Sequence, residues 1–369
     1  MSRDRDDIAL LRGLVERYSP STQEGEAVSF LVDAMERRGL RAWVDEAGNA
    51  VGETGRGEPH IALVGHIDTV PGIVPVRGES GRLYGRGTVD AKGPLAAFAA
   101  ALSRFSAIDS ARITVVGAVE EECPTSKGAR HLVDRMRPDY VFIGEPSGWD
   151  SVTIGYKGHV GFDYRLKQPN AHHAGNHRRA GERAIGLYNA LQTRVAGQAT
   201  ESEFESPRLE LRRFSTCDEG LTEGVEAYFS VRVPPGYDLD DLIGFVTEQA
   251  DPAEIVCDQR LAGVVAAKNT ALVRALLKGI RKEGGRPTFK KKTGTSDMCI
   301  VGPAWKCPIA AYGPGDSSLD HTPDEHIVLD EYLRSIEVLA AALEHLTVTE
   351  RINPTTNRRD GPPGVQSGD

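Results

Sequence analysis

Histidine and carboxylate residues follow several short apolar stretches, where their side chains could bind metal ions. The first apolar stretch runs from Ile61 to Val64 and is followed by His66 and Asp68. An apolar run without helical periodicity is typical of a buried strand in a parallel sheet. On an extended segment, His66 and Asp68 point to the same side, so the carboxylate can fix the imidazole ring. The pair therefore indicates a candidate metal site just beyond a strand.

Similar polar residues recur along the chain, so the candidate ligands come from five separate loops. They are His66 with Asp68, then Asp90, the triplet Glu120–Glu122, Glu145 and His321. Acidic groups that meet at the ends of neighbouring strands repel one another unless a cation lies between them. Imidazole and carboxylate ligands suit zinc, cobalt or manganese. The set exceeds what one tetrahedral zinc needs and favours two metal ions that share a bridging carboxylate.

The elements that must position these residues alternate between strand-like and helix-like patterns. Strand-like runs occupy residues 61–64, 113–119 and 140–143, and helical patterns occupy 94–105 and 128–136. This alternation predicts an α/β fold with a mostly parallel sheet and helices on both faces.

The pattern changes to antiparallel strands and two helices in the middle of the chain, and the α/β style later resumes. We therefore predict a discontinuous catalytic domain, residues 1–154 and 263–346, and an inserted α+β domain over residues 155–262. The segment 347–369 is rich in Pro, Gly, Asn and Arg without apolar periodicity, which predicts a disordered tail.

Composition narrows the class of protein. The chain has 369 residues, enough for two domains, and a formal net charge of −9, which argues against nucleic-acid binding. No apolar run is long enough to span a bilayer, and the charged N-terminus lacks a signal-peptide core, so we expect a cytoplasmic protein with no membrane segment. The five cysteines include no Cys-x-x-Cys pair, which disfavours a thiolate zinc site.

Several motifs together resemble the di-metal peptidase/deacylase family. That family includes aminoacylase, acetylornithine deacetylase, succinyl-diaminopimelate desuccinylase and glutamate carboxypeptidase. The matching segments are His66-Ile-Asp68-Thr-Val-Pro-Gly, Gly85-Arg-Gly-Thr-Val-Asp90-Ala-Lys-Gly, the glutamate triplet, Gly144-Glu145-Pro and Asp320-His321-Thr-Pro-Asp-Glu. The resemblance implies a zinc-peptidase-like catalytic domain, a lid and dimerisation domain, and two divalent metal ions, zinc in the first place and cobalt as the alternative.

The resemblance also implies roles for the metal ligands. His66 and Glu145 would bind one metal, His321 would bind the other, and Asp90 would bridge them. Asp68 would orient His66 without binding metal directly.

The glutamate triplet can be aligned with the family in two registers. In the register adopted here, Glu121 is the general base and Glu122 is a metal ligand. In the other register, Glu120 and Glu121 take these roles. The base would take a proton from the attacking water and return it to the leaving amine.

The inserted domain resembles the family's lid, through which the subunits would form a homodimer. A lid histidine would reach the partner subunit's site and stabilise the oxyanion. His173 is the candidate for this role, and the neighbouring His172 stays open as the alternative.

Within the family, the segments Lys292-Thr-Gly-Thr-Ser-Asp-Met298 and 311–321 most resemble the [LysW]-lysine and [LysW]-ornithine hydrolases of lysine and arginine biosynthesis. Those enzymes release the amino acid from the C-terminal glutamate of a small acidic carrier protein, LysW. The resemblance implies that the substrate is bound by Lys292, Gly294 and Thr295. An acetylornithine deacetylase, another small-molecule deacylase or a dipeptidase is the alternative.

Basic clusters on this acidic chain offer a physical reason for a carrier substrate. A basic rim would steer an acidic carrier protein toward the cleft, although an ordinary solvated surface explains the same residues equally well. The clusters are Arg208, Arg212 and Arg213; Arg178, Arg179 and Arg183; and Arg281, Lys282, Arg286 and Lys290–Lys292.

Overall fold

The fold is built on one large sheet. The computed structural model describes residues 3–105, 110–172 and 175–352 of the chain. Its central strands are parallel to one another, and antiparallel strands complete it toward both edges. The strand order is β1 (Arg41–Val44), β2 (Ala50–Thr54), β6 (Arg112–Ala118), β3 (His60–His66), β7 (Tyr140–Gly144), β15 (Ile309–Ala311), β8 (Ser151–Tyr156) and β13 (Val264–Val265), and β14 (Thr288–Lys292) also pairs with β8.

Helices cover both faces of this sheet, because side chains along its strands alternate between two cores. In β3, Ile61 and Leu63 pack into one core, whereas Ala62 and Val64 pack into the other. The first core contains α1 (Arg3–Val15), α2 (Gly25–Arg37), α3 (Lys92–Leu102), α7 (Ala271–Lys282) and α9 (Leu329–Ile352); the second contains α4 (Lys127–Arg135) and α8 (Met298–Trp305). The predicted fold class, an α/β sheet with helices on both faces, is confirmed.

Helix α3 packs closely against the sheet because its residues are small. Five of its eleven residues are alanine, and every residue from Lys92 to Leu102 is buried. At the ends of β3 and β7, the paired residues Gly65 and Gly144 leave room for this helix, since a Cβ on Gly144 would lie 2.9 Å from the Phe98 ring. The two glycines therefore let α3 lie close to the sheet directly beside the candidate ligands.

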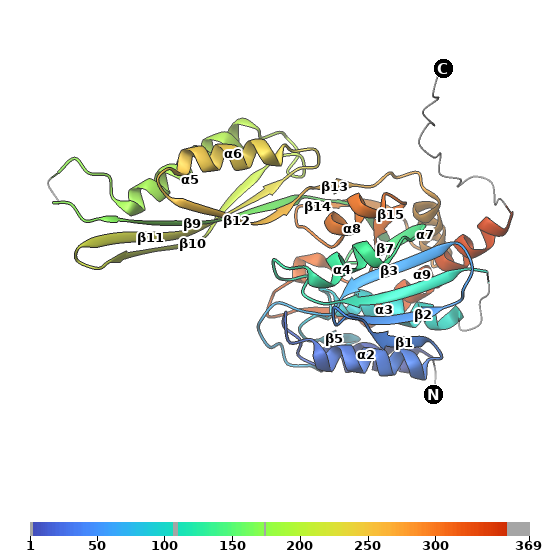
Figure 1. Cartoon of the computed structure of the whole chain (residues 1–369). Coiled ribbons are helices and arrows are strands. Elements are labelled where there is room, and N and C mark those ends of the chain that lie inside the picture. Colours follow the sequence, from blue (N-terminus) through green and yellow to red (C-terminus); the bar gives the residue numbers. More distant parts are fainter. Residues whose placement is uncertain (1–2, 106–109, 173–174, 353–369) are drawn as a thin grey trace, which may run out of the picture.

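A second, antiparallel sheet has its own core and projects from the first (Figure 1). Helices α5 (Ala180–Gly197) and α6 (Leu239–Ala250) cover one of its faces. Its strand order is β10 (Arg208–Asp218), β11 (Thr222–Val233), β9 (Gly158–Pro169) and β12 (Glu254–Leu261). The chain enters this unit after β8 and returns to the large sheet at β13, so the unit interrupts the large sheet in sequence.

The C-terminal helix α9 continues to Ile352, which takes the first residues of the predicted tail into the helix. The remaining tail, 353–369, lies outside the described residues. A small third sheet of β4 (Arg77–Glu79), β5 (Arg82–Tyr84) and β16 (His326–Val328) flanks the candidate site. Among the described helices, none has the length and apolar character needed to cross a membrane.

Candidate metal centre

The candidate ligands meet at the carboxyl ends of the parallel strands, as the positions of the loops require. His66 ends β3, the glutamate triplet follows β6, and Glu145 follows β7. Asp90 precedes α3, and His321 lies in the loop between β15 and β16. Residues that are far apart in the sequence thereby line one site.

Two ligand groups form there and share Asp90. His66, Asp90 and Glu145 make up one group, and Asp90, Glu122 and His321 make up the other; within each, the ligand atoms lie within 4.8 Å of one another. One oxygen of Asp90 lies 3.1 Å from Nε2 of His66, and its other oxygen lies 3.0 Å from Nε2 of His321. This is the arrangement that a carboxylate bridging two cations requires.

The electrostatics of the site favour added positive charge. Burial, and after it the nearby Asp90, raise the pKa of Glu145 to about 8. Burial also raises the pKa of Glu121 well above its ordinary value. Burial opposes the charged form of Asp90 too, but hydrogen bonds with His321 and His66 hold its pKa well below the usual range. Two imidazoles and three carboxylates, without a thiolate, fit two borderline divalent cations.

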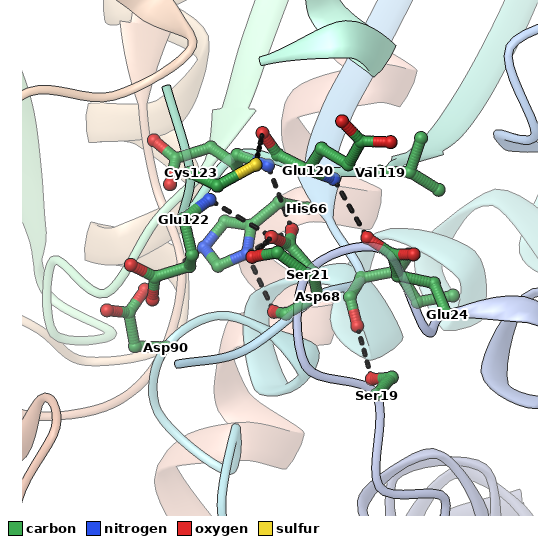
Figure 2. A network of polar contacts seen from close by, with 12 residues as sticks. Ser19, Ser21, Glu24, His66, Asp68, Asp90, Val119, Glu120, Glu122 and Cys123 are labelled. Atoms are coloured by element: carbon green, nitrogen blue, oxygen red, sulfur yellow. Dashed lines mark hydrogen bonds and ion pairs between the residues drawn. The ribbon is translucent and has the colours of Figure 1, made fainter. Parts of the chain in front are cut away.

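Asp68 connects the histidine to the glutamates (Figure 2). One of its carboxylate oxygens accepts the backbone N–H of Glu121, and the other accepts that of Glu122, each at 3.0 Å. The Ser21 hydroxyl donates to Asp68 at 2.7 Å, and Nδ1 of His66 lies 3.5 Å from the same carboxylate and 3.0 Å from the Asp68 carbonyl oxygen. Asp68 is fully buried, so it fixes the ring and the glutamate turn together.

The three glutamates point to different places. Glu122 joins the second ligand group, with its carboxylate 2.9 Å from Nε2 of His321. Glu121 lines the cavity beside it. The Glu120 side chain instead accepts a hydrogen bond from the Thr125 hydroxyl at 2.5 Å. This geometry favours the register in which Glu121 is the base and Glu122 is a ligand.

Sequence reasoning missed the support beneath Asp90. Glu325 is fully buried and accepts the backbone N–H groups of Val89 and Asp90, at 2.9 and 3.2 Å. Its other oxygen forms an ion pair with Arg86 at 2.7 Å. The signal was present, because Glu325 closes the Asp-His-Thr-Pro-Asp-Glu motif.

A cavity of about 760 Å³ lies over both ligand groups. Lys292, Gly294 and Thr295 line it, where the sequence predicted substrate contacts. The second sheet closes it from the other side with side chains that sequence reasoning did not assign to the site: His159, Tyr228, Arg232 and Gln259. Arg232 donates a hydrogen bond to the Thr295 hydroxyl and so joins the two sheets.

The described residues do not test the prediction of a lid histidine. His173 lies outside them. His172, the alternative, is exposed. Cys123 also lines the cavity, but it belongs to neither ligand group.

Comparison with known proteins identifies relatives along most of the chain. The chain is 44% identical over 351 residues to the [LysW]-lysine hydrolase of Deinococcus radiodurans, covering 91% of this chain and 96% of that one. It is 28% identical to the [LysW]-lysine/[LysW]-ornithine hydrolase of Sulfurisphaera tokodaii, covering 93% and 96%.

Solved structures share the fold. An M20 family metallo-carboxypeptidase from Sulfolobus solfataricus matches with a TM-score of 0.78 at 16% identity, over 93% of this chain and 99% of that one. Human carnosine dipeptidase 1 matches with a TM-score of 0.74 at 16% identity, over 94% and 96%.

The family model described as Peptidase family M20/M25/M40 matches residues 62–345. That span includes every predicted metal ligand, and the expected resemblance to the di-metal peptidases is confirmed with it. The chain therefore belongs to peptidase family M20/M25/M40 and is a hydrolase.

Proposed function

We propose that this protein is a metal-dependent amidohydrolase that releases lysine, ornithine or both from the C-terminal glutamate of the carrier protein LysW. The observation that carries the proposal is the pair of ligand groups that share Asp90 under a cavity with a basic wall, formed by Arg212, Arg232, Lys291 and Lys292. The names of the Deinococcus and Sulfurisphaera relatives support the substrate.

Two divalent ions are the proposed cofactors, zinc in the first place and cobalt as the alternative. His66 and Glu145 would hold one ion, Glu122 and His321 the other, and Asp90 both. When bound, such ions activate water and polarise an amide carbonyl.

The chain's own residues would move the proton and position the substrate. Glu121 takes the proton of the attacking water and gives it to the leaving amine; its place in the cavity beside the ligand Glu122 supports this role. Asp68 holds Glu121 in place through its backbone. Lys292, Gly294 and Thr295 would bind a substrate carboxylate.

We further propose a homodimer through the inserted domain, in which His173 of one subunit serves the other's site. The exposure of β10 supports this, because β10 is an edge strand of the second sheet and most of its residues are exposed, and an exposed edge strand can pair with another chain.

The test compares two substrates with the zinc- or cobalt-loaded protein: carrier-linked lysine and free Nα-acetylornithine. We expect amine release from the carrier conjugate, and we expect it to weaken when Arg212, Arg213 and Lys290 are neutralised together. Fast turnover of acetylornithine with none of the conjugate would instead assign the protein to the small-molecule deacylases and discard the carrier.

A further inference from the structure

Arg212 occupies an irregular position in β10. The pairing of β10 with β11 shifts register between Leu211 and Arg213, so Arg212 is the extra residue of a β-bulge. Leu211 pairs with Phe229, and Arg213 pairs with Tyr228. Bulges re-aim side chains and are common beside active sites. Here the bulge adds a guanidinium to the cavity wall, which Arg212 lines.

The sheet face beside Arg212 is the roof of the cavity. Tyr228, Arg232 and His159 lie on this face and line the cavity, whereas the alternate residues of β11 pack under α5 and α6. Tyr228 can lie flat across the sheet because its neighbour is Gly161; a Cβ there would lie 2.1 Å from the Tyr228 hydroxyl.

Arg212 is exposed, and among the described residues it has neither a hydrogen-bond nor an ion-pair partner. Its neighbours are engaged: Arg213 pairs with Asp163 at 2.9 Å, and Arg232 donates to Thr295. An arginine that lines a cavity and forms no ion pair with a protein carboxylate is available to a carboxylate of the ligand, which it can bind through two parallel hydrogen bonds.

The proposed substrate has such a carboxylate on its acyl side. A C-terminal glutamate has two carboxyl groups; the scissile amide uses one, and the other stays ionised. The leaving amino acid carries a second carboxylate. A simple acetyl amino acid has the leaving-side carboxylate alone, so a cation for the acyl side would separate the two substrate classes.

We infer that Arg212 binds the free carboxylate of the carrier's C-terminal glutamate and thereby selects carrier-linked substrates over simple acyl amino acids. This inference rests on the proposed function and names the residue that sets its acyl specificity. The leaving-side carboxylate is left to Lys292, Gly294 and Thr295, which line the same cavity.

The test uses small substrates, so that docking of the carrier does not contribute. The α- and γ-glutamyl isomers of Nα-glutamyl-lysine are each compared with an aminobutanoyl analogue that lacks the free carboxylate. We expect Arg212→Met to lower kcat/KM for the preferred glutamyl isomer by about 10- to 100-fold and to leave the analogues within about twofold, the size of a hydrogen-bonded charge contact. Arg212→Lys should recover part of the loss.

Arg165→Met is the matched control, because Arg165 lies on the same sheet and pairs with Asp163 outside the cavity lining. It should leave both substrate series unchanged. Equal losses on both series with Arg212→Met, or an unchanged preference, would overturn the inference.

Turnover of carrier-linked lysine by the unmodified enzyme is measured in parallel. Turnover of the conjugate without a preference for glutamyl over aminobutanoyl substrates would overturn the inference and leave the proposed function standing. No turnover of the conjugate would overturn both.

Discussion

Asp68 shows how one buried carboxylate can organise a site without binding the substrate. It holds the ring of His66 and receives the backbone N–H groups of two glutamates that we assign different tasks. A neutral side chain of the same shape cannot do both, because an amide offers one oxygen where Asp68 offers two.

Asp68→Asn should therefore lower metal affinity by about 10- to 100-fold, as loss of a residue that orients a ligand typically does. Competition with a chromophoric chelator would measure the affinity, and metal analysis of the dialysed protein would give the stoichiometry. Affinity equal to that of the unmodified protein would refute the positioning role.

The glutamate triplet allows each register to be tested separately. Glu121→Gln should keep two bound metal ions and lose about 10²- to 10⁴-fold in kcat, since it removes a general base. Glu122→Gln should lose one ion, and Glu120→Gln should stay near normal because its side chain contacts Thr125. A severe loss of kcat in Glu120→Gln with little loss in Glu121→Gln would move the base one residue earlier.

At the scale of the element, the ends of β3 and β7 depend on having no side chain at two paired positions. A methyl group on Gly144 would lie 2.9 Å from the Phe98 ring and 3.0 Å from the Cα of Gly65. Gly144→Ala should lower the free energy of unfolding by about 1–3 kcal/mol through overpacking and displace the adjacent Glu145. Denaturant unfolding would measure this.

Gly25→Ala is the control for that substitution. Gly25 begins α2, and a Cβ there meets nothing within 4 Å. Alanine should leave stability equal or raise it by up to about 1 kcal/mol. Equal effects of the two substitutions would show that the packing of α3 does not depend on the glycine pair.

His60, the first residue of β3, should make the free energy of unfolding depend on pH. Burial lowers the pKa of His60 from 6.5 to about 4, so the folded protein keeps the imidazole neutral where the unfolded chain would protonate it. The contribution of the neutral imidazole to the free energy of unfolding is complete above pH 6.5. It falls by at most about 3 kcal/mol as the pH decreases toward 4.

His60→Gln should therefore lose less stability than the unmodified protein when the pH is lowered from 7 to 4.5. Urea unfolding of both proteins at each pH would give the difference. A parallel decline in the two proteins would place the acid sensitivity elsewhere.

The sequence predicted the strands that end in ligands because apolar runs and polar loops are both local signals. The motif that ends in Glu325 marks this residue, but it does not reveal what Glu325 binds, since those backbone groups lie in a loop far away in the sequence. Nor could the sequence reveal that Arg212 lines the cavity. A β-bulge changes the direction of a strand residue and interrupts the period-2 pattern from which that direction is predicted.

At the scale of the whole molecule, an acidic protein presents cations around one cavity. Arg212, Arg232, Lys291 and Lys292 line it although the formal net charge is −9. If an acidic carrier is the substrate, long-range attraction should speed its association and be screened by salt.

We therefore expect kcat/KM for the carrier conjugate to fall several-fold between about 50 and 500 mM salt, because the screening length shortens over this range. The value for a small glutamyl-lysine substrate should change by less than about twofold. Steady-state kinetics across the salt series would measure both. Equal responses would show that the basic wall does not steer the carrier.

Because the inserted domain interrupts the large sheet, the strands of that sheet cannot all pair until the insertion has been synthesised. Strand β8 pairs with β13, β14 and β15, and each of these follows the inserted domain in sequence. When the ribosome has completed the insertion, β7 and β8 therefore still have unpaired edges, although the inserted unit already has all of its own strands. An open, apolar strand edge is a template for pairing with another chain. The yield of folded protein should therefore depend on how quickly the last third of the chain follows, and a fragment that ends at residue 262 should aggregate.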